Sequence, residues 1–187
     1  MTRHELRTGR LLLRAWRAQD RELFAAMNAD PRVMRWFPSV QTRAESDAMV
    51  DRFARIHEER GYTCWAVQVL DSAHGPAPFV GFVGLVPPSF DPPFTHADPC
   101  VEIGWRLAAQ WWGLGLATEA ADAALRWGLT QAGLAEIVSF TVPPNLASQA
   151  VMQRIGMRYD GTFEHPRGAG RWWGSHTLYR ATEADLA

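Results

Sequence analysis

The chain has 187 residues, of which 47% are hydrophobic and 21% charged, and its formal net charge is −1. These values are close to globular averages, so they argue against a disordered chain and against a membrane protein. The near-neutral charge also argues against a nucleic-acid partner, because binding to a phosphate backbone draws on excess positive charge. We expect one domain over residues 1–187, as a monomer or a homodimer.

Two further features bear on the cellular location of the protein and on metal binding. The N-terminal stretch MTRHELRTGRLLLRAW is charged and lacks the apolar segment of a signal peptide, so we expect a cytoplasmic protein without a membrane partner. Cys64 and Cys100 are far apart and lack CxxC or CxxH spacing. We therefore expect two reduced thiols and no metal site.

Taken in chain order, the N-terminal part is predicted to contain strand 10–17, helix 20–27, a short helical turn from Pro31 and helix 42–60. The long helix has Thr42 as its N-cap, and Glu45 completes a capping box. Gly61 ends it.

A hairpin is predicted next, from β-rich runs at 62–70 and 79–86 that are separated by a Ser/Gly/Pro turn. The segment PPSFDPPFTHADP at 87–99 has too many prolines for regular structure, so we expect a surface loop near a site.

In the second half, strands and helices alternate: strand 100–107, helix 117–130, strand 136–142, helix 145–155, and strands near 157–165 and 172–181, before an end, ATEADLA, that we expect to fray. A strand, a helix and a strand in the centre form a βαβ unit, which makes its two strands parallel. With antiparallel strands at each end, the prediction is a mixed α/β sheet flanked by helices.

The stretch QWWGLGLATEA, residues 110–120, lies where a predicted strand gives way to a helix. Gly113 and Gly115 allow positive φ, so that successive N–H groups point outward at the start of the helix and can bind phosphate. A Walker loop is nearly excluded, because Leu116 and Ala117 stand where Lys and Ser or Thr are required. A dinucleotide fingerprint fits poorly, because Thr118 replaces its third glycine.

The remaining pattern, Gln-x-x-Gly-x-Gly/Ala at the start of a helix, resembles the acetyl-CoA pyrophosphate loop of the GNAT superfamily of N-acyltransferases, and Gln110, Trp111, Trp112, Gly113, Leu114 and Gly115 match it position by position. The segments TGRLLLRAWRAQD, DPRVMRW, EIGWRLAAQWWGLGLATEA and NLASQAVMQRIGM are similar to its ribosomal-protein N-terminal acetyltransferase (Rim-type) branch. This resemblance covers nearly the whole chain.

The resemblance implies a mixed, mostly antiparallel sheet whose two central parallel strands splay apart and admit the pantetheine arm of acetyl-CoA. It implies acetyl-CoA as the cosubstrate, with no metal. The residues that it places at the cosubstrate are Trp105, Arg106, Leu107, Gln110, Trp112, Gly113, Leu114, Gly115, Ala117, Thr118, Asn145 and Ser148.

Glu102 is the first candidate for a catalytic base, because it lies on the strand that leads into the loop, on the face opposite the apolar one. The alternatives are a solvated carboxylate and an ion pair with Arg106. His165, beside a proline-fixed bend, is the second candidate base, with a plain surface histidine as the alternative. His176 is assigned to strand packing or hydrogen bonding.

Asn145 and Ser148 are first explained as an N-cap and the third residue of the same helical turn. The resemblance adds a pantetheine contact for Asn145 and makes Ser148 a candidate acid near the sulfur. It also implies a backbone N–H near Trp105 or Arg106 as the oxyanion donor.

Acceptor selectivity is expected to come from residues 20–60, the Pro-rich loop and residues 163–175, with aromatic candidates Trp36, Phe37, Phe90, Phe94, Trp172 and Trp173. The predicted function is acetyl transfer from acetyl-CoA to a primary amine, with a peptide or protein N-terminus favoured, by direct attack in a ternary complex. Two alternatives stay open: an acetyltransferase of a small-molecule amine, and a non-catalytic module that binds or senses acyl-CoA.

Overall fold

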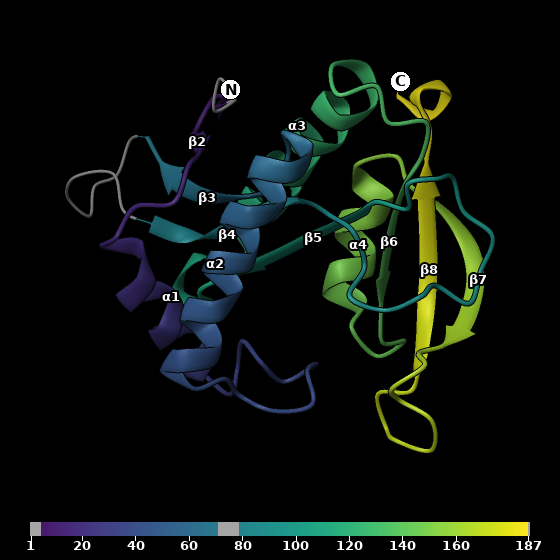
Figure 1. Cartoon of the computed structure of the whole chain (residues 1–187), viewed down its shortest axis with the longest axis horizontal. Helices are drawn as coiled ribbons and strands as arrows, with labels where there is room; N and C mark the ends of the chain where they lie inside the picture. The colour runs from purple at the N-terminus through teal and green to yellow at the C-terminus, as the bar shows by residue number, and fades with distance from the viewer. Residues whose placement is uncertain (1–4, 71–78, 187) are drawn as a thin grey trace.

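Eight strands form one sheet in the part of the chain that the computed structural model describes, residues 5–70 and 79–186. Their order is β1-β2-β3-β4-β5-β6-β8-β7, and neighbouring strands are antiparallel except for β5 and β6 (Figure 1). The predicted mixed sheet with one central parallel pair is therefore confirmed. The strands are Leu6–Arg7 (β1), Leu11–Arg14 (β2), Cys64–Val69 (β3), Phe79–Val86 (β4), Glu102–Leu107 (β5), Ile137–Thr141 (β6), Arg158–Glu164 (β7) and Ser175–Ala181 (β8).

The longest helix begins and ends where its sequence predicts. Thr42 Oγ1 accepts a hydrogen bond from the N–H of Glu45, and the Glu45 carboxylate accepts one from the N–H of Thr42. Gly61 ends the helix with a φ of 77°. Within the described ranges, none of the helices has both the length and the apolar composition that a bilayer crossing requires. The helices are Asp20–Ala29 (α1), Arg43–Arg60 (α2), Leu116–Thr130 (α3) and Leu146–Arg154 (α4).

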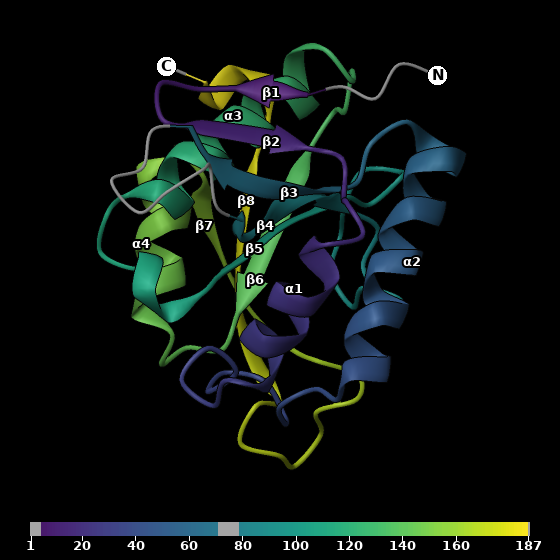
Figure 2. The same ribbon diagram turned by 90° about the vertical axis from the view of Figure 1, so that its left-hand side faces the viewer.

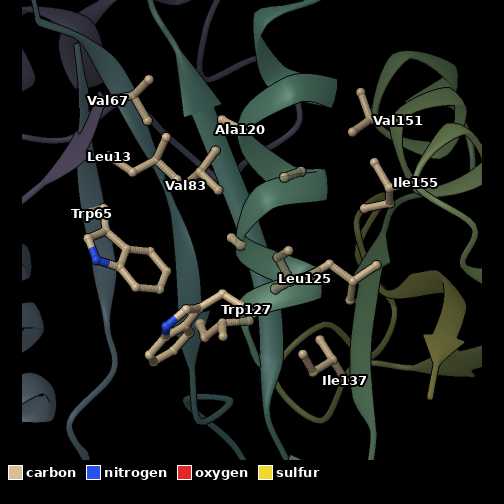
Figure 3. Packing of buried hydrophobic residues seen from close by; sticks show 14 of the residues in the cluster. Leu13, Trp65, Val67, Val83, Ala120, Leu125, Trp127, Ile137, Val151 and Ile155 are labelled. Atoms are coloured by element: carbon tan, nitrogen blue, oxygen red, sulfur yellow. The ribbon is translucent and has the colours of Figure 1, made fainter. Parts of the chain in front are cut away.

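Helices cover both faces of the sheet, which explains why β3 is buried along its whole length. Cys64 and Ala66 pack under α1 and α2, whereas the alternating Trp65 and Val67 belong to the core under α3 and α4 (Figures 1 and 2). The Trp65 ring meets Trp127 of α3 edge to face, with centroids 5.3 Å apart (Figure 3). The alternation follows from the period of two residues along a strand.

The Pro-rich loop 87–99 replaces a helix as the cover of the C-terminal strands. In Figure 1 it crosses in front of β8, on the same side as α2. Phe90 and Phe94 pack against a cluster formed by Val138 of β6, Phe163 of β7 and Leu178 of β8. The prolines prevent a helix or strand in this segment, so its aromatic side chains cover the apolar surface of the C-terminal strands instead.

The parallel strands β5 and β6 part soon after they meet. Their one registered pair in the described chain is Glu102 with Val138. One residue further along β6, Ser139 Oγ donates a hydrogen bond to the carbonyl of Ile103 at 2.9 Å. A side-chain hydrogen bond therefore replaces the backbone hydrogen bond that a continued ladder would form there. The splay that the resemblance implies is present.

The N-terminal part differs from prediction mainly in its first strands. The strand expected at 10–17 ends at Arg14, where the side chain of Arg14 forms an ion pair with Asp20 at the start of α1. The short strand β1 was not predicted, since two residues carry no periodic signal. The turn predicted between β3 and β4 falls on residues 71–78, which lie outside the described chain.

Two C-terminal boundaries also differ. The strand expected at 172–181 begins at Ser175, because the chain before it makes successive turns in which a Cβ on Gly168 or Gly174 would clash with the backbone of the other glycine. The end expected to fray instead forms a short 3₁₀ turn at Glu183–Asp185, where Asp185 accepts hydrogen bonds from Thr182.

A buried ion pair ties β2 to the first turn of α1. Arg14 and Asp20 are 2% and 1% exposed, and two hydrogen bonds of 2.6 and 2.9 Å join the guanidinium to both carboxylate oxygens. Gln68 of β3 accepts from Arg14 Nε at 2.7 Å. The charges are fully paired, so losing one partner leaves the other buried without compensation.

Replacing Asp20 with alanine is expected to lower the free energy of unfolding by about 3–5 kcal/mol, because Arg14 remains buried without its counter-charge. Asp51→Ala is the matched control: this carboxylate pairs with Arg21 but its side chain is 64% exposed. The control should lose less than about 1 kcal/mol. Urea denaturation followed by circular dichroism measures both, and equal losses would contradict the assignment.

Candidate active site

A cavity of about 1540 Å³ lies where β5 and β6 part. The turn after α1, helix α2 and residues of the Pro-rich loop line it on one side, and the loop before α3 together with α4 on the other. Pockets for single small ligands usually measure about 300–1,000 Å³. The cavity is therefore large enough for an extended cosubstrate and a second ligand together.

The loop before α3 offers backbone donors at the cavity wall. Gly113 and Gly115 have φ values of 76° and 75°, and α3 begins directly afterwards at Leu116. The first N–H groups of a helix lack acceptors within it, and the helix dipole favours an anion there. A Cβ at Gly113 would meet nothing within 4 Å, so the wall is open at this point. These features fit the pyrophosphate of the CoA group that the resemblance implies.

Arg10, which sequence reasoning did not single out, holds this loop. Its guanidinium donates to the carbonyl of Leu114 at 2.9 Å and forms an ion pair of 2.6 Å with Glu119 of α3. Thr8 Oγ1 and the N–H of Arg10 also donate to Glu119. No local pattern links residues that are 109 positions apart, so this contact could not be predicted from the sequence.

Trp112 fixes the other end of the loop, because its indole N–H donates to the carbonyl of Leu107 at 2.8 Å. Gln110 and Leu114 are exposed and do not line the cavity, although the Leu114 carbonyl anchors Arg10. The other residues expected at the cosubstrate do line it, namely Trp105, Arg106, Leu107, Trp112, Gly113, Gly115, Ala117, Thr118, Asn145 and Ser148.

The alternation of β5 decides which backbone groups face the splay. The carbonyls of Val101 and Ile103 accept hydrogen bonds from β6, so alternate residues of this strand direct their backbone groups toward β6. The N–H of Trp105 therefore points to the same edge, beyond the last registered pair. Arg106 directs its N–H toward β4, where it is registered with Phe82. Of the two donors left open by the sequence, the geometry favours Trp105.

Asn145 caps α4 as predicted, with its side-chain oxygen accepting from the N–H of Ser148 at 3.3 Å. Its amide nitrogen donates to Thr141 Oγ1 at 2.9 Å and to Ser148 Oγ at 3.0 Å. Ser148 thus accepts a hydrogen bond from Asn145 and keeps its own hydroxyl hydrogen for a partner in the cavity. The capping of α4 by Asn145 therefore leaves the Ser148 hydroxyl able to bind a ligand.

Glu102 lines the cavity at the last registered pair of β5 and β6. Within the described chain its carboxyl group has neither a hydrogen bond nor an ion pair, and the predicted alternative of a pair with Arg106 is not formed. Burial raises the pKa of Glu102 to about 8, and attraction by Arg52 opposes this rise. The group is therefore mainly protonated at pH 7 and titrates just above it.

His165 also lines the cavity, with its ring 4.2 Å from that of Phe90. Burial lowers the pKa of His165, helped by repulsion from His176. The N–H of Arg167 donates to His165 Nδ1 at 3.1 Å, which places the hydrogen of the neutral ring on Nε2. The lone pair that a base requires is thus already engaged, and this favours Glu102 over His165.

His176 of β8 stacks on Phe163 of the neighbouring strand β7, with ring centroids 5.5 Å apart, and it also lines the cavity. Of the aromatic residues expected near the acceptor, Phe94 and Trp172 do not line the cavity, while Trp36, Phe37, Phe90 and Trp173 do. Among the described residues, no group of three or more His, Cys, Asp or Glu side chains is arranged to hold a metal ion.

Comparison with known proteins agrees with this geometry. A family model described as an acetyltransferase (GNAT) domain matches residues 10–158. Protein YkkB of Bacillus subtilis is 30% identical over 84% of this chain and 87% of its own length. FsC-acetyl coenzyme A-N(2)-transacetylase of Aspergillus fumigatus is also 30% identical, over 84% of this chain and 66% of its own length.

The fold is shared with a Rim-type enzyme. The crystal structure of ribosomal-protein-S5-alanine acetyltransferase from Vibrio fischeri matches with a TM-score of 0.73 and 17% identity, covering 98% of this chain and 99% of that one. The family model, the splayed sheet and the glycine loop lead to one conclusion: the chain belongs to the GNAT family and is an acetyltransferase that uses acetyl-CoA.

Proposed function

We propose that the protein transfers the acetyl group of acetyl-CoA to the N-terminal α-amine of a peptide or protein, by direct attack of the amine in a ternary complex. The observation that carries this proposal is the environment of Glu102. This desolvated carboxyl group has no hydrogen-bond or ion-pair partner among the described residues, and it borders the cavity at the point where β5 and β6 part. A group of this kind is suited to accept the proton of an attacking amine.

The pKa of Glu102 supports an α-amine rather than a lysine side chain as the acceptor. A carboxylate with a pKa of about 8 accepts a proton from an α-ammonium group, whose pKa is about 7.7–8.0, at almost no cost in free energy. The same transfer from a lysine ammonium group, with a pKa near 10.4, costs about 3 kcal/mol. Proton transfer alone therefore favours N-terminal amines at neutral pH.

The remaining roles follow from the positions of their donors. When bound, acetyl-CoA supplies the activated acetyl group. The N–H groups of residues 113–115 and of the first turn of α3 are assigned to its phosphates. The N–H of Trp105 is assigned to the oxygen on which charge develops. The hydroxyl of Ser148, held by Asn145, serves as a weak acid, which suffices because a thiol with a pKa near 8.5 already leaves well.

A small-molecule amine is the second candidate acceptor, and one specific observation favours it. The Aspergillus fumigatus relative is named for acetyl transfer to N(2) of FsC, whereas the Vibrio fischeri enzyme is named for a ribosomal-protein alanine. The two names show that related folds accept amines of different kinds, and the fold does not select between them.

The acceptor class is tested with peptides that each carry a single free amine. A peptide whose only amine is its N-terminal one should release thiol from acetyl-CoA at least tenfold faster at pH 7 than an N-terminally blocked peptide whose only amine is a lysine side chain. A faster reaction of the lysine peptide would contradict the proposal. Thiol release with small amines and with neither peptide would support the second candidate.

Glu102→Gln is expected to lower kcat with saturating peptide by about 10²–10⁴-fold, since it removes the base. Because the base acts in its deprotonated form, the wild-type kcat should rise with pH and level off above the pKa of about 8. The variant should keep a low kcat at every pH, with no more of a rise than the peptide's own α-ammonium group contributes, whereas His165→Ala should keep the wild-type rate. A Glu102→Gln kcat that equals the wild-type value at pH 9 would remove Glu102 as the base.

Gly113→Ala is expected to weaken acetyl-CoA binding on the order of tenfold, because alanine strains the positive-φ loop that presents the N–H donors. Gly133→Ala is the matched control: φ is 69°, a Cβ there also meets nothing within 4 Å, and the residue does not line the cavity. Both variants should lose similar stability. Only Gly113→Ala should show a smaller rise of Tm with acetyl-CoA, and an equal rise in both would contradict the loop assignment.

A further inference from the structure

A buried arginine forms part of the cavity wall. Arg106 is only 8% exposed, yet it lines the cavity. Its Nη1 donates to Asn28 Oδ1 at 2.6 Å, and Asn28 in turn donates to Ser46 Oγ. The ring of Phe37 lies 4.2 Å from the guanidinium carbon. A neutral amide and an aromatic ring thus fix the orientation of the cation.

No carboxylate compensates this charge in the described part of the chain, because none of the ion pairs there includes Arg106. Its Nε is buried without a hydrogen-bond partner. Its Nη2 likewise has no partner among these residues but is not buried, which places it at the cavity surface. Burial without a counter-charge is costly, so a ligand anion would satisfy this guanidinium.

The charge state agrees with this geometry. Burial lowers the pKa of Arg106 to about 10, so the guanidinium remains charged at neutral pH. Glu102 lies on the same face of β5, but its pKa of about 8 leaves it mainly protonated at pH 7. Arg35 and Arg52 also line the cavity and have no ion pair among the described residues.

Arg106 lies on the face of the sheet opposite the loop that we assign to the phosphates of CoA. It is registered with Phe82, which packs in the core under α1 and α2. The loop at 113–115 leads into α3, which packs on the other face. Arg106 is one of the residues expected at the cosubstrate, but its guanidinium lies on the side of the cavity that remains for the acceptor, so the inference concerns its side chain alone.

An open surface connects Arg106 to Glu102. Gly104 lies between them on the same face, and a Cβ there would meet only Glu102 Oε1, at 3.9 Å. Residues four apart on a strand have Cα atoms about 13 Å apart. An extended peptide of about four residues spans this distance.

We propose that the acceptor carries an anionic oxygen group, a carboxylate or a phosphate, which binds Arg106 while its amine lies at Glu102. The inference rests on the proposed function and narrows its substrate class. In a peptide acceptor, the spacing places the acid at the second to fourth residue.

The test measures thiol release from acetyl-CoA by wild-type protein with pairs of alanine-based tetrapeptide amides. One member of each pair has aspartate at the second, third or fourth residue, and the other has asparagine there. A phosphoserine and serine pair separates phosphate from carboxylate. At one position or more, the anionic peptide should have a kcat/KM about 10–100-fold higher, the range expected for a charge-assisted hydrogen bond.

Two variants assign the preference to Arg106. Asn28→Asp keeps the shape but places a carboxylate beside the guanidinium, and Arg106→Gln removes the cation. Either change should bring the ratio of anionic to neutral kcat/KM close to one, while the rise of Tm with acetyl-CoA remains. Gln131→Glu adds the same charge at the exposed end of α3, outside the cavity lining, and should keep the preference.

Each outcome bears on one claim. Equal turnover of every pair by the wild type would overturn this inference and leave the proposed function standing. A preference that survives in Asn28→Asp, or an acetyl-CoA response lost with it, would also overturn the inference, since another group would then bind the anion or Arg106 would serve the cosubstrate. No thiol release from any amine, with the acetyl-CoA response intact, would contradict the proposed function and the inference with it.

Discussion

The parting of β5 and β6 is the constraint on which the rest of the structure depends. A parallel pair normally continues its ladder, but here the ladder stops after one registered pair, and Ser139 satisfies the carbonyl of Ile103 instead. The N–H of Trp105 is left facing the gap. A backbone N–H that is shielded from water is stabilised by a hydrogen-bond partner, so a ligand that enters the gap can accept from the N–H of Trp105. Close packing of α3 against the sheet, through Ala120, Ala121 and Ala124, brings the start of the helix to the same place.

The sheet also separates two chemical environments. On one face, glycines and a helix N-terminus present backbone donors suited to phosphates. On the other, Glu102 and Arg106 come from a single strand, and Gly104 keeps the space between them open. Alternation along six residues of β5 therefore places a carboxyl group, a gap and a cation in line on one face of the sheet. The cavity at the splay is lined by residues from both faces.

Features that depend on residues close together in the sequence could be predicted from it. Features that depend on contacts between distant residues could not. The capping box of α2, the glycine loop and the alternation of β5 all express local backbone rules, and the structure has each of them. The environment of Arg106 depends on Asn28, 78 positions away, so composition alone could not reveal that its charge is uncompensated. The roles of Glu102 and Ser148 remain predictions, because they concern reacting groups rather than packing.

The contact of Thr8 and Arg10 with Glu119 has a consequence for the order of folding. These residues are up to 111 positions apart, and such distant contacts form late because the intervening chain must first be closed into a loop. The glycine loop and α3 can thus form before the N-terminal segment docks on them. On the ribosome, more than half of the chain must therefore be synthesised before the N-terminal segment can bind Glu119 and hold the glycine loop in place.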